Sequence, residues 1–261
     1  MLKVSVIGAG ITGITTAYYL AKRGAYVTIY DERRYPAMAT SYANGGQLSA
    51  SNAEVWNSWR NVQKGLKWLT KTDAPLKINP SPSFEKYSWL LKFMLEIKNA
   101  EKNTEQTCRW ALEAHQLYKN IATEENINFD KVEKGILHVY SDKDEFANAH
   151  KVNEIYRRAG LERWAVTAEE CFNIEPALKR SNSLIGGFYN TSDYTGDIHK
   201  FCIELEKVLE NKYGVKYNHG RLDDISTLEG PVIVCAGIGS RQLAKTVGDN
   251  LPIYPVKGYS I

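Results

Sequence analysis

The sequence is short of cysteine, and its four cysteines are too scattered to suggest a metal or redox site. Cys108, Cys171, Cys202 and Cys235 show none of the short CxxC or CxxH spacings that structural zinc sites and redox pairs use. We therefore expect reduced, packed thiols and no bound metal. The net charge is also small, +3 over 261 residues, with basic and acidic residues mixed along the chain. This mixed pattern gives no stripe of Lys and Arg that could follow a phosphate backbone, so we expect no nucleic-acid partner.

Long hydrophobic runs are absent as well. No stretch of about 18 uncharged apolar residues occurs, so we expect no membrane-spanning helix. The apolar run in MLKVSVIGAG leads into a glycine loop rather than a cleavage site, which indicates a strand and not a signal peptide. The composition is that of an ordinary globular protein long enough for two domains, and we expect a cytoplasmic location.

The first feature that carries chemistry is a glycine-rich turn after a short buried strand. Residues 4–7, VSVI, are typical of a strand buried on both faces of a parallel sheet. The following GAGITG matches G-x-G-x-x-G: Gly8 permits a tight turn, Gly10 lets backbone approach a pyrophosphate, and Gly13 lets a helix pack on the strand. A pyrophosphate at the helix N-terminus would be stabilised by unpaired N–H groups and the helix dipole.

A helix and a second strand complete a βαβ unit after this turn. Apolar residues recur at helical spacing up to Ala21, Gly24 ends the helix, and residues 26–30 form a second β-rich run. Asp31 follows about 20 residues beyond the first glycine, where a carboxylate accepts hydrogen bonds from ribose hydroxyls. In isolation Asp31 could be a solvated residue at a strand end. Arg33 and Arg34 could instead favour a 2′-phosphate, but the acidic residue at the ribose position argues against NADP.

The segment after the βαβ unit bears on the choice between FAD and NAD. Residues 40–49, TSYANGGQLS, are small, hydrogen-bonding and glycine-rich, which suits a loop that brings backbone close to a flat ring system. A plain surface turn has a similar composition. We interpret the segment as a flavin-side loop, which makes FAD the expected cofactor.

At this point the sequence resembles the FAD-dependent D-amino acid oxidase superfamily and, within it, the small subunits of bacterial D-amino acid dehydrogenases. The resemblance extends over essentially the whole chain. It rests on the dinucleotide pattern at 8–31, TSYANGGQ at 40–47, LKW at 66–68 with APL at 74–76, EPAL at 175–178, TGD at 195–197, VIVCAG at 232–237 and YPVKGYS at 254–260.

The resemblance implies an α/β fold: a Rossmann-like FAD-binding domain of the glutathione-reductase type, interleaved with an α+β substrate domain that carries an antiparallel sheet. We expect residues 1–75 and 195–250 to form the FAD-binding domain and residues 76–194 and 251–261 the substrate domain. Family members continue beyond Ile261, so the substrate domain is expected to be incomplete. The residues that grip the substrate usually come from the later part, and we therefore name no catalytic residue.

The motifs and the resemblance together give a set of candidate FAD-binding residues. Asn44 to Leu48 would line the flavin, Gln47 would neighbour the substrate, and Leu222 would offer backbone to the adenine. The candidates are Ile7, Gly8, Ala9, Gly10, Ile11, Thr12, Gly13, Asp31, Glu32, Arg33, Thr40, Ser41, Asn44, Gly45, Gly46, Gln47, Leu48, Leu222, Ala236 and Gly237.

The activity implied by the resemblance is oxidative deamination of a D-amino acid to a 2-oxo acid and ammonia. Electrons would pass to an acceptor other than NAD, such as a quinone or a membrane respiratory chain, with peripheral contact at the inner face of the bacterial membrane. Alternatives are a glycine or sarcosine oxidase, a hydroxyproline dehydrogenase and an NAD-dependent dehydrogenase. Outside enzymology, the alternative is an inactive FAD-binding fragment.

Further structural expectations concern the rest of the chain. The tryptophans between residues 56 and 110 are expected to be mostly core, and residues 88–97, SWLLKFMLEI, form an amphipathic helix suited to a membrane surface, a partner or a buried position. Residues 214–217 should form a strand beside the one at 231–237. Strands at 135–140, 185–189 and 253–261 should build the antiparallel sheet, with helices at 144–159 and 198–211 between them.

Overall fold

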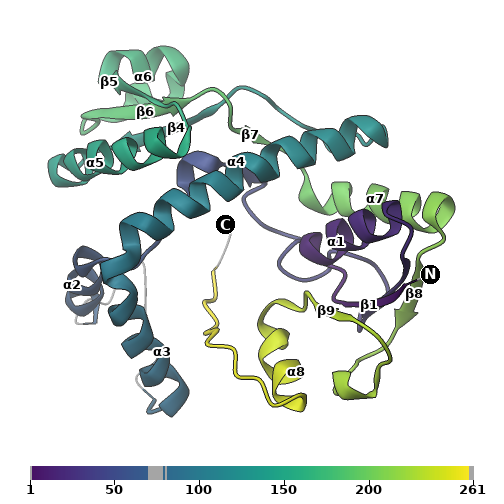
Figure 1. The fold of residues 1–261 in the computed structure, drawn as a ribbon. Helices are drawn as coiled ribbons and strands as arrows, with labels where there is room; N and C mark the ends of the chain where they lie inside the picture. The colour runs from purple at the N-terminus through teal and green to yellow at the C-terminus, as the bar shows by residue number, and fades with distance from the viewer. Residues whose placement is uncertain (1, 70–78, 80, 259–261) are drawn as a thin grey trace. The chain divides into compact units, whose positions relative to one another are not determined.

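The computed structural model describes residues 2–69, 79 and 81–258 (Figure 1). Its strands are β1 Lys3–Ile7, β2 Tyr26–Asp31, β3 Gln47–Leu48, β4 Ile136–Tyr140, β5 Trp164–Thr167, β6 Gly186–Asn190, β7 Tyr194–Thr195, β8 Lys216–His219 and β9 Val232–Val234. The α-helices are α1 Ile11–Lys22, α2 Trp59–Trp68, α3 Phe84–Leu95, α4 Ala100–Glu124, α5 Lys143–Ala159, α6 Ala168–Ile174, α7 Ile198–Tyr213 and α8 Ser240–Thr246. The short 3-10 helices are η1 Ala50–Asn52, η2 Glu96–Asn99, η3 Pro176–Arg180, η4 Ile225–Thr227 and η5 Gly237–Gly239.

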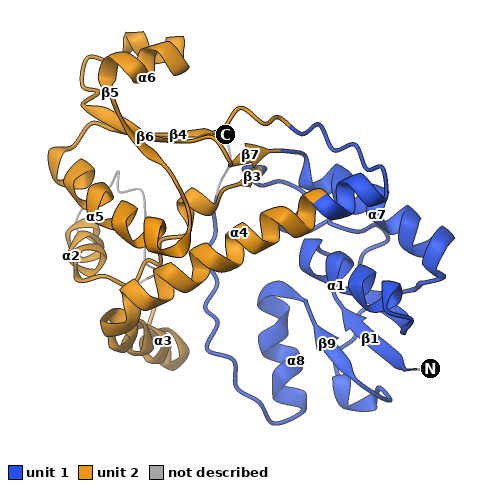
Figure 2. Ribbon diagram, turned by 45° about the horizontal axis from the view of Figure 1, so that its top comes forward, with its two compact units in different colours: residues 1–46, 120–131, 196–261 blue, residues 47–119, 132–195 orange. Residues whose placement is uncertain are grey.

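The chain divides into two compact units, coloured separately in Figure 2. Unit 1 comprises residues 1–46, 120–131 and 196–261, and unit 2 comprises residues 47–119 and 132–195. The expected domains divide the chain differently: residues 47–69 are grouped by the sequence with the nucleotide domain but pack in unit 2, and residues 251–258 pack in unit 1. The assignment of FAD binding and substrate binding to separate domains stays a prediction.

Unit 1 is built on a parallel sheet of four strands in the order β8-β2-β1-β9. Ile7 at the end of β1 lies opposite Tyr30 of β2 and Val234 of β9, so the carboxyl ends of three strands meet at one edge of the sheet. Ligands of open α/β sheets bind outside this edge. The register therefore explains why residues distant in sequence can contribute to one site.

Two helices of unit 1 pack together beside the sheet. Helix α1 buries Ile14, Ala17 and Tyr18, and it contacts α7, whose buried residues include Phe201 and Leu205. Helix α7 begins where the Asp197 carboxylate accepts the Lys200 N–H at 2.9 Å, and it ends at Gly214, whose φ of 64° is left-handed. Local capping chemistry thus fixes both ends of the helix that packs against α1.

Unit 2 contains a three-stranded antiparallel sheet in the order β4-β6-β5 and a short antiparallel pair of β3 with β7. Helices α5 and α6 contact this sheet. Phe188 on the central strand β6 is fully buried, with the rings of Phe146 and His150 close to it. The observed α/β architecture, with a parallel sheet and separate antiparallel sheets, confirms the expected fold class.

Several local expectations are wrong. Residues 253–258 form no strand. Tyr259 to Ile261 and residues 74–76 of the APL segment lie outside the described residues, so expectations for them stay predictions. The strand near 214–217 is β8, and it pairs with β2 rather than with β9. Trp56, Trp59 and Trp110 are 67%, 61% and 62% exposed, so the expected core position is wrong for these three, whereas Trp68 and Trp89 are half-buried.

Candidate dinucleotide site

The turn after β1 depends on glycine at two positions. Gly8 has a φ of +104°, and a Cβ there would lie 2.5 Å from the carbonyl oxygen of Cys235. A Cβ on Gly13 would overlap the carbonyl oxygen of Gly8, so α1 can pack this closely on the turn only without a side chain. Gly10, in contrast, has only the Ser41 hydroxyl near its missing side chain, at 3.4 Å. The turn is therefore closed toward the sheet and open at Gly10, as an approaching phosphate requires.

Asp31 is fixed against this turn by two backbone amides. Its Oδ2 accepts the N–H of Ala9 at 2.7 Å, and its Oδ1 accepts the N–H of Arg33 at 2.8 Å. A carboxylate has about four acceptor positions, so each oxygen keeps capacity for a hydroxyl donor. Asp31 is half-buried, which leaves it accessible to a ribose. The arrangement fits the ribose-binding role that its position predicts.

Ala37 is a contributor to the turn that sequence reasoning missed. Its N–H donates to the Ala9 carbonyl at 2.8 Å, and it is 2% exposed with a φ of 58°. Non-glycine residues rarely adopt this left-handed conformation. No residue-type signal at Ala37 could have revealed the contact, because alanine does not favour such a φ.

The N-terminus of α1 is where an anion would bind. Gly10 occupies the N-cap position and supplies no side chain, and the N–H of Ile11 donates to the Ser41 hydroxyl at 3.1 Å. Since this hydroxyl accepts from the helix, its own proton remains available for an anion. Thr12 and Gly13 lie in the first turn, where N–H groups have no partner within the helix. The donor set of amides and one hydroxyl suits a pyrophosphate.

An apolar cluster closes the site beside the sheet edge. Ile7 is buried with Ile225 and Leu243, and Leu222 and Ala236 pack against them. The structure thus brings together Ile7, Leu222 and Ala236 from three separate segments. Ile7 is more than 200 residues away in the chain from the other two. Gly237 is exposed at the start of η5.

Glu32 and Arg33 lie at the exposed rim of the site. The Glu32 carboxylate is 3.8 Å from the guanidinium groups of both Arg33 and Arg221, and the Arg33 carbonyl is 3.3 Å from His219 Nδ1. Ion pairs this exposed contribute little to stability. The Glu32 and Arg33 side chains take no part in the turn, and their contact with a nucleotide stays a prediction.

The expected flavin-side loop is organised by its own side chains. The Asn44 amide donates to the carbonyls of Thr40 and Ser41 at 3.3 and 3.4 Å, and its oxygen accepts the Gly46 N–H at 2.8 Å. Gly46 in turn accepts the Gly196 N–H at 2.9 Å. Thr40, Asn44 and Gly45 are exposed. Asn44 therefore shapes the loop, whereas the sequence suggests only that it lines a cofactor.

Gln47 and Leu48 belong to unit 2, where they form β3 and lie opposite Thr195 and Tyr194 of β7. The other eighteen candidate residues belong to unit 1. The chain thus leaves unit 1 at Gly46, and its last return to unit 1 is at Gly196, within the TGD segment. Two contacts join the loop to the TGD segment: the Gly196 N–H donates to the Gly46 carbonyl in unit 1, and Gln47 pairs with Thr195 in unit 2.

A buried carboxylate in unit 2 holds the residues that follow β3. Asp193 is fully buried and accepts the N–H groups of Ala50 and Ser51 at 3.0 and 3.2 Å, together with the hydroxyls of Ser49 and Ser51. Ser51 Oγ also lies 2.6 Å from His138 Nε2. No sequence pattern predicts this cluster, because its members come from three distant segments.

The cluster does not form a hydrolytic triad. Burial, reinforced by Arg163, lowers the pKa of His138, so its imidazole stays neutral. Because the Ser51 hydroxyl donates to Asp193, it accepts from His138 Nε2–H, and the histidine cannot take the serine proton. The arrangement is a structural clamp on residues 49–51.

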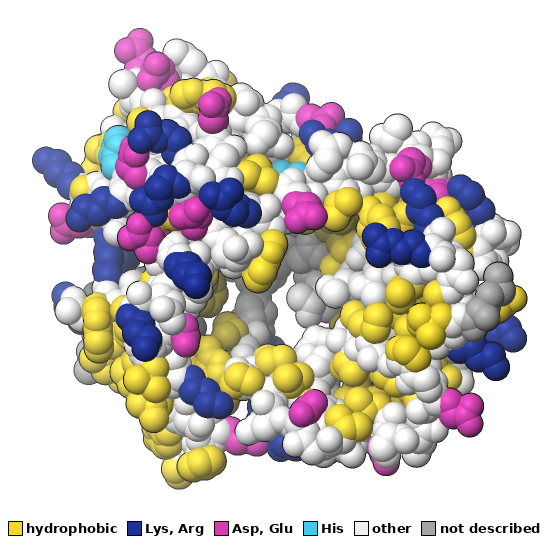
Figure 3. Space-filling view, in the orientation of Figure 1, with side chains coloured by type: hydrophobic (Ala, Val, Ile, Leu, Met, Phe, Trp, Pro, Cys, Tyr) yellow, Lys and Arg dark blue, Asp and Glu magenta, His cyan; other side chains and the backbone are white. Residues whose placement is uncertain are grey.

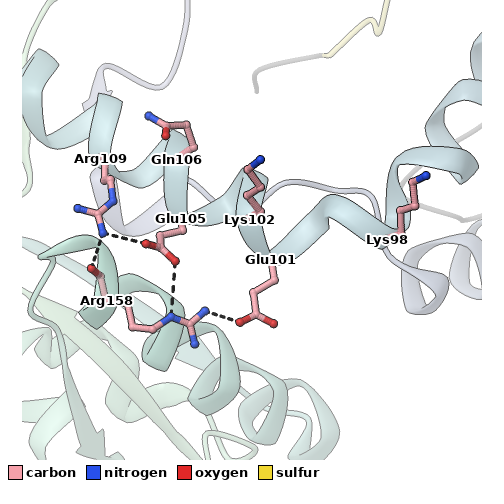
Figure 4. Close-up of a pocket in the computed structure, with 7 residues that line it drawn as sticks. All are labelled: Lys98, Glu101, Lys102, Glu105, Gln106, Arg109 and Arg158. Carbon is pink, nitrogen blue, oxygen red and sulfur yellow. Dashed lines mark hydrogen bonds and ion pairs between the residues drawn. The ribbon is translucent and has the colours of Figure 1, made fainter.

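A surface pocket of unit 2 is lined by charged residues of η2, α4 and α5 (Figure 4). The Arg109 guanidinium is paired with Glu105 at 2.8 Å and also donates to the Arg158 carbonyl, while Arg158 is paired with Glu101 and Glu105. These cations are already neutralised by neighbouring carboxylates. The pocket therefore ties α4 to α5 and offers no reactive group.

Residues 3–261 match the family described as DAO, FAD dependent oxidoreductase. The chain belongs to this family. D-amino acid dehydrogenase 3 of Mesorhizobium japonicum is 49% identical over all of this chain and 67% of its own length. D-amino acid dehydrogenase of Paramagnetospirillum magneticum is 39% identical over all of this chain and 66% of its own length. The chain thus spans about two thirds of these members of the FAD-dependent oxidoreductase family.

Solved structures support the fold of the family. Glycine oxidase from Geobacillus kaustophilus has a TM-score of 0.65 and 17% identity, with 95% of this chain and 59% of that chain covered. L-proline dehydrogenase from P. horikoshii has a TM-score of 0.61 and 19% identity, with 95% and 56% covered. At this identity the likeness shows a shared fold and not a shared substrate.

Family membership confirms the recognised resemblance and the choice of FAD over NAD as cofactor. The chain's glycine turn, Asp31 and Ser41 fit the ADP half of that cofactor. Within the described residues, no helix is both long enough and apolar enough to cross a bilayer.

Proposed function

We propose that this chain is the FAD-binding part of a D-amino acid dehydrogenase, which deaminates D-amino acids oxidatively to 2-oxo acids and ammonia. The observation that carries the proposal is the 49% identity to a protein named D-amino acid dehydrogenase over the entire chain. Glycine oxidase shares only the fold, at 17% identity, and therefore supports that alternative weakly.

The chain's own residues would bind and orient the cofactor. Amides at the start of α1 and the Ser41 hydroxyl would hold the pyrophosphate, and Asp31 would accept hydrogen bonds from the ribose. The loop that Asn44 organises would lie along the flavin side. Bound FAD supplies the hydride-accepting chemistry, and the protein contributes position and electrostatics.

The proposal extends to domains and electron flow. The glycine turn supports nucleotide binding by unit 1, and the antiparallel sheet of unit 2 would then belong to the substrate domain. Electrons would pass to an acceptor other than NAD, in the form of a quinone or a membrane respiratory chain. An acceptor in the membrane would bring the protein, itself cytoplasmic, into peripheral contact with the inner face of the membrane.

Reduction of bound flavin by amino acids under anaerobic conditions tests the proposal. A D-amino acid should bleach the flavin band of the FAD-loaded protein, with appearance of the 2-oxo acid, whereas the L-enantiomer should not. An artificial electron acceptor should then reoxidise the flavin in the absence of oxygen. Bleaching by glycine or sarcosine with rapid reoxidation by oxygen would instead identify an amine oxidase. Flavin that no amino acid reduces would identify an inactive FAD-binding fragment.

A further inference from the structure

Strand β8 ends beside the candidate dinucleotide site, on the opposite side of β2 from the glycine turn. The sheet order β8-β2-β1 has the turn at the end of β1 and Asp31 at the end of β2. In an ADP group the 5′-phosphate and the base leave the ribose at opposite ends. A pyrophosphate at the turn and a ribose at Asp31 would therefore direct the base toward the end of β8. Of the candidate FAD-binding residues, Leu222 is expected at the adenine, and it would offer only backbone.

His219 is the last residue of β8 and lies beside the ribose-binding carboxylate. It pairs in register with Asp31, and the Gly220 N–H donates to the Asp31 carbonyl at 2.9 Å. Residues in register on neighbouring strands project their side chains to the same face of the sheet. The His219 side chain is exposed. It is thus adjacent to Asp31 and open to a ligand.

Two contacts orient the His219 ring. The half-buried Tyr217 ring stacks on it, with 5.7 Å between the centroids and 26° between the planes. The ring atom Nδ1 lies 3.3 Å from the Arg33 carbonyl oxygen. The imidazole is therefore held between a supporting ring of its own strand and the backbone that follows β2, before any nucleotide binds.

The contact with Arg33 decides which nitrogen of His219 carries the proton. A carbonyl oxygen can only accept, so Nδ1–H is the donor in this hydrogen bond. In the neutral ring Nε2 then keeps its lone pair and is an acceptor. Adenine carries an exocyclic amine, which donates hydrogen bonds. The ring nitrogen and the amine are thus complementary.

Surface charge offers no substitute for such a directional contact. Figure 3 shows Lys and Arg side chains interspersed with Asp and Glu side chains over the face that it presents. At the rim of the site, the Glu32 carboxylate lies 3.8 Å from the guanidinium groups of both Arg33 and Arg221. These opposite charges offset one another, so hydrogen bonds rather than a positive field would distinguish one base from another.

We propose that His219 recognises the base of the bound dinucleotide, with Nε2 accepting a hydrogen bond from the exocyclic amine of adenine. The inference rests on the proposed function, because it requires the ADP half of FAD to bind at the glycine turn. It goes further by assigning a preference for 6-aminopurines to one side chain. The contact acts in binding and takes no part in flavin chemistry.

Titration calorimetry at pH 8 with two nucleotides tests the assignment. Purine riboside 5′-diphosphate has hydrogen in place of the amine and is otherwise identical to ADP. The wild type should bind ADP about fivefold more tightly than this analogue, as one exposed hydrogen bond gives. His219→Phe keeps a flat ring on Tyr217 but removes the acceptor. It should lower the affinity for ADP about fivefold and leave the affinity for the analogue unchanged.

Three further variants make the test specific. His219→Gln should recover part of the ADP preference, because a carboxamide oxygen also accepts hydrogen bonds. Asn218→Ala changes an exposed residue on the opposite face of β8 and should leave both affinities unchanged. Glu32→Ala removes the other acceptor side chain at the rim and should keep the ADP preference.

Equal binding of ADP and the analogue by the wild type would overturn the proposal, as would an ADP preference that persists in His219→Phe. A preference lost in Glu32→Ala and kept in His219→Phe would assign the contact to Glu32 instead. Binding of neither nucleotide would overturn the proposal together with the role of the glycine turn. Flavin reduction by D-amino acids separates this result from the proposed activity, because that assay can fail while the ADP preference persists.

Discussion

At the scale of single residues, the cofactor site depends on a carboxylate that backbone amides hold in place. Asp31 accepts the N–H groups of Ala9 and Arg33, so its orientation is set before any ligand binds. Preorganised charged acceptors of this kind bind hydroxyls more strongly than free ones, because less conformational freedom is lost on binding.

Asp31→Ala should weaken FAD binding by about 2 kcal/mol, roughly thirtyfold, because the ribose loses its acceptor and Ala9 loses a partner for its N–H. Fluorescence titration with FAD measures the change. Asp223→Ala is the matched control, since that carboxylate is exposed and pairs with Arg221. A similar loss in both variants would contradict a specific role for Asp31.

Two glycines in helices should respond oppositely to the same substitution. Gly13→Ala should abolish or severely weaken FAD binding, because the new methyl group would overlap the Gly8 carbonyl and displace the turn. Gly65→Ala in α2 meets no atom within 4 Å and should stabilise the protein by about 0.5–1 kcal/mol through helix propensity. Thermal unfolding and FAD titration of both variants distinguish the two effects. Undiminished FAD binding by Gly13→Ala would contradict the packing described for the turn.

A half-buried glutamate on α7 should make stability depend on pH. Burial, together with repulsion from Glu210, raises the pKa of Glu206 to about 7, against weaker opposing influences from His219, Lys207 and Tyr217. The folded state therefore binds this proton more tightly than the unfolded state, where the pKa is near 4.5. The stability that this bound proton contributes is fully present below about pH 4.5 and is lost as the pH rises through about 7.

Glu206→Gln should consequently stabilise the protein at pH 8 by about 1 kcal/mol, allowing for solvent screening, and should have little effect at pH 5. Urea unfolding at both pH values measures the difference. Glu204→Gln on the same helix, where the carboxylate pairs with Lys207, serves as control. A stabilisation that is equal at pH 5 and pH 8 would contradict the raised pKa.

At the scale of elements, the Asp193 clamp joins β7 to the residues that follow β3. Four donors of Ser49, Ala50 and Ser51 converge on this one buried carboxylate. A buried carboxylate is stable only when its hydrogen bonds are satisfied, and its donors are equally dependent on it. The clamp therefore fixes the path of residues 49–51 in unit 2.

Asp193→Ala should destabilise unit 2 by about 3 kcal/mol, because it leaves these donors buried without an acceptor. Asp193→Asn keeps one acceptor oxygen and should recover part of this loss. Urea unfolding followed by far-ultraviolet circular dichroism measures both. Equal stability of Asp193→Ala and the wild type would show that the clamp contributes nothing.

Elements set by local sequence were predictable, and elements set by distant contacts were not. The strand, glycine turn, helix and second strand over residues 3–31 follow from local patterns, and the structure has them with ends within a few residues. The parallel pairing of β8 with β2 joins strands about 190 residues apart in the chain, so residue type gives no guide to it. Exposure of Trp59 and Trp110 likewise depends on what packs against each helix rather than on helical spacing, and Trp56 precedes α2 and lies on no helix.

The same distinction applies to the candidate site. The tight turn at Gly8 and the close helix packing at Gly13 were predictable because they require glycine at particular spacings, and ribose binding by Asp31 stays a prediction. The contact of Ala37 with Ala9 and the Asp193 clamp were not, because backbone amides and serines serve many purposes. The role of Asn44 was predicted only in part, since its side chain organises the loop backbone.

At the scale of the whole molecule, the chain passes between its two units at residues 46–47, 119–120, 131–132 and 195–196. The first and the last of these passages lie next to each other. Gln47 is opposite Thr195 in unit 2, and the Gly46 carbonyl accepts the Gly196 N–H in unit 1. The glycine turn is wholly within unit 1, so we expect that unit to recognise the ADP half of FAD by itself.

Competition between nucleotides for the purified protein tests this central claim most directly. FAD should bind at one molecule per chain, ADP should displace it competitively, and Gly13→Ala should abolish both interactions while NAD binds much more weakly. FAD binding that ADP does not affect, or NAD binding as tight as FAD binding, would contradict the claim that the turn after β1 holds the ADP half of a flavin cofactor.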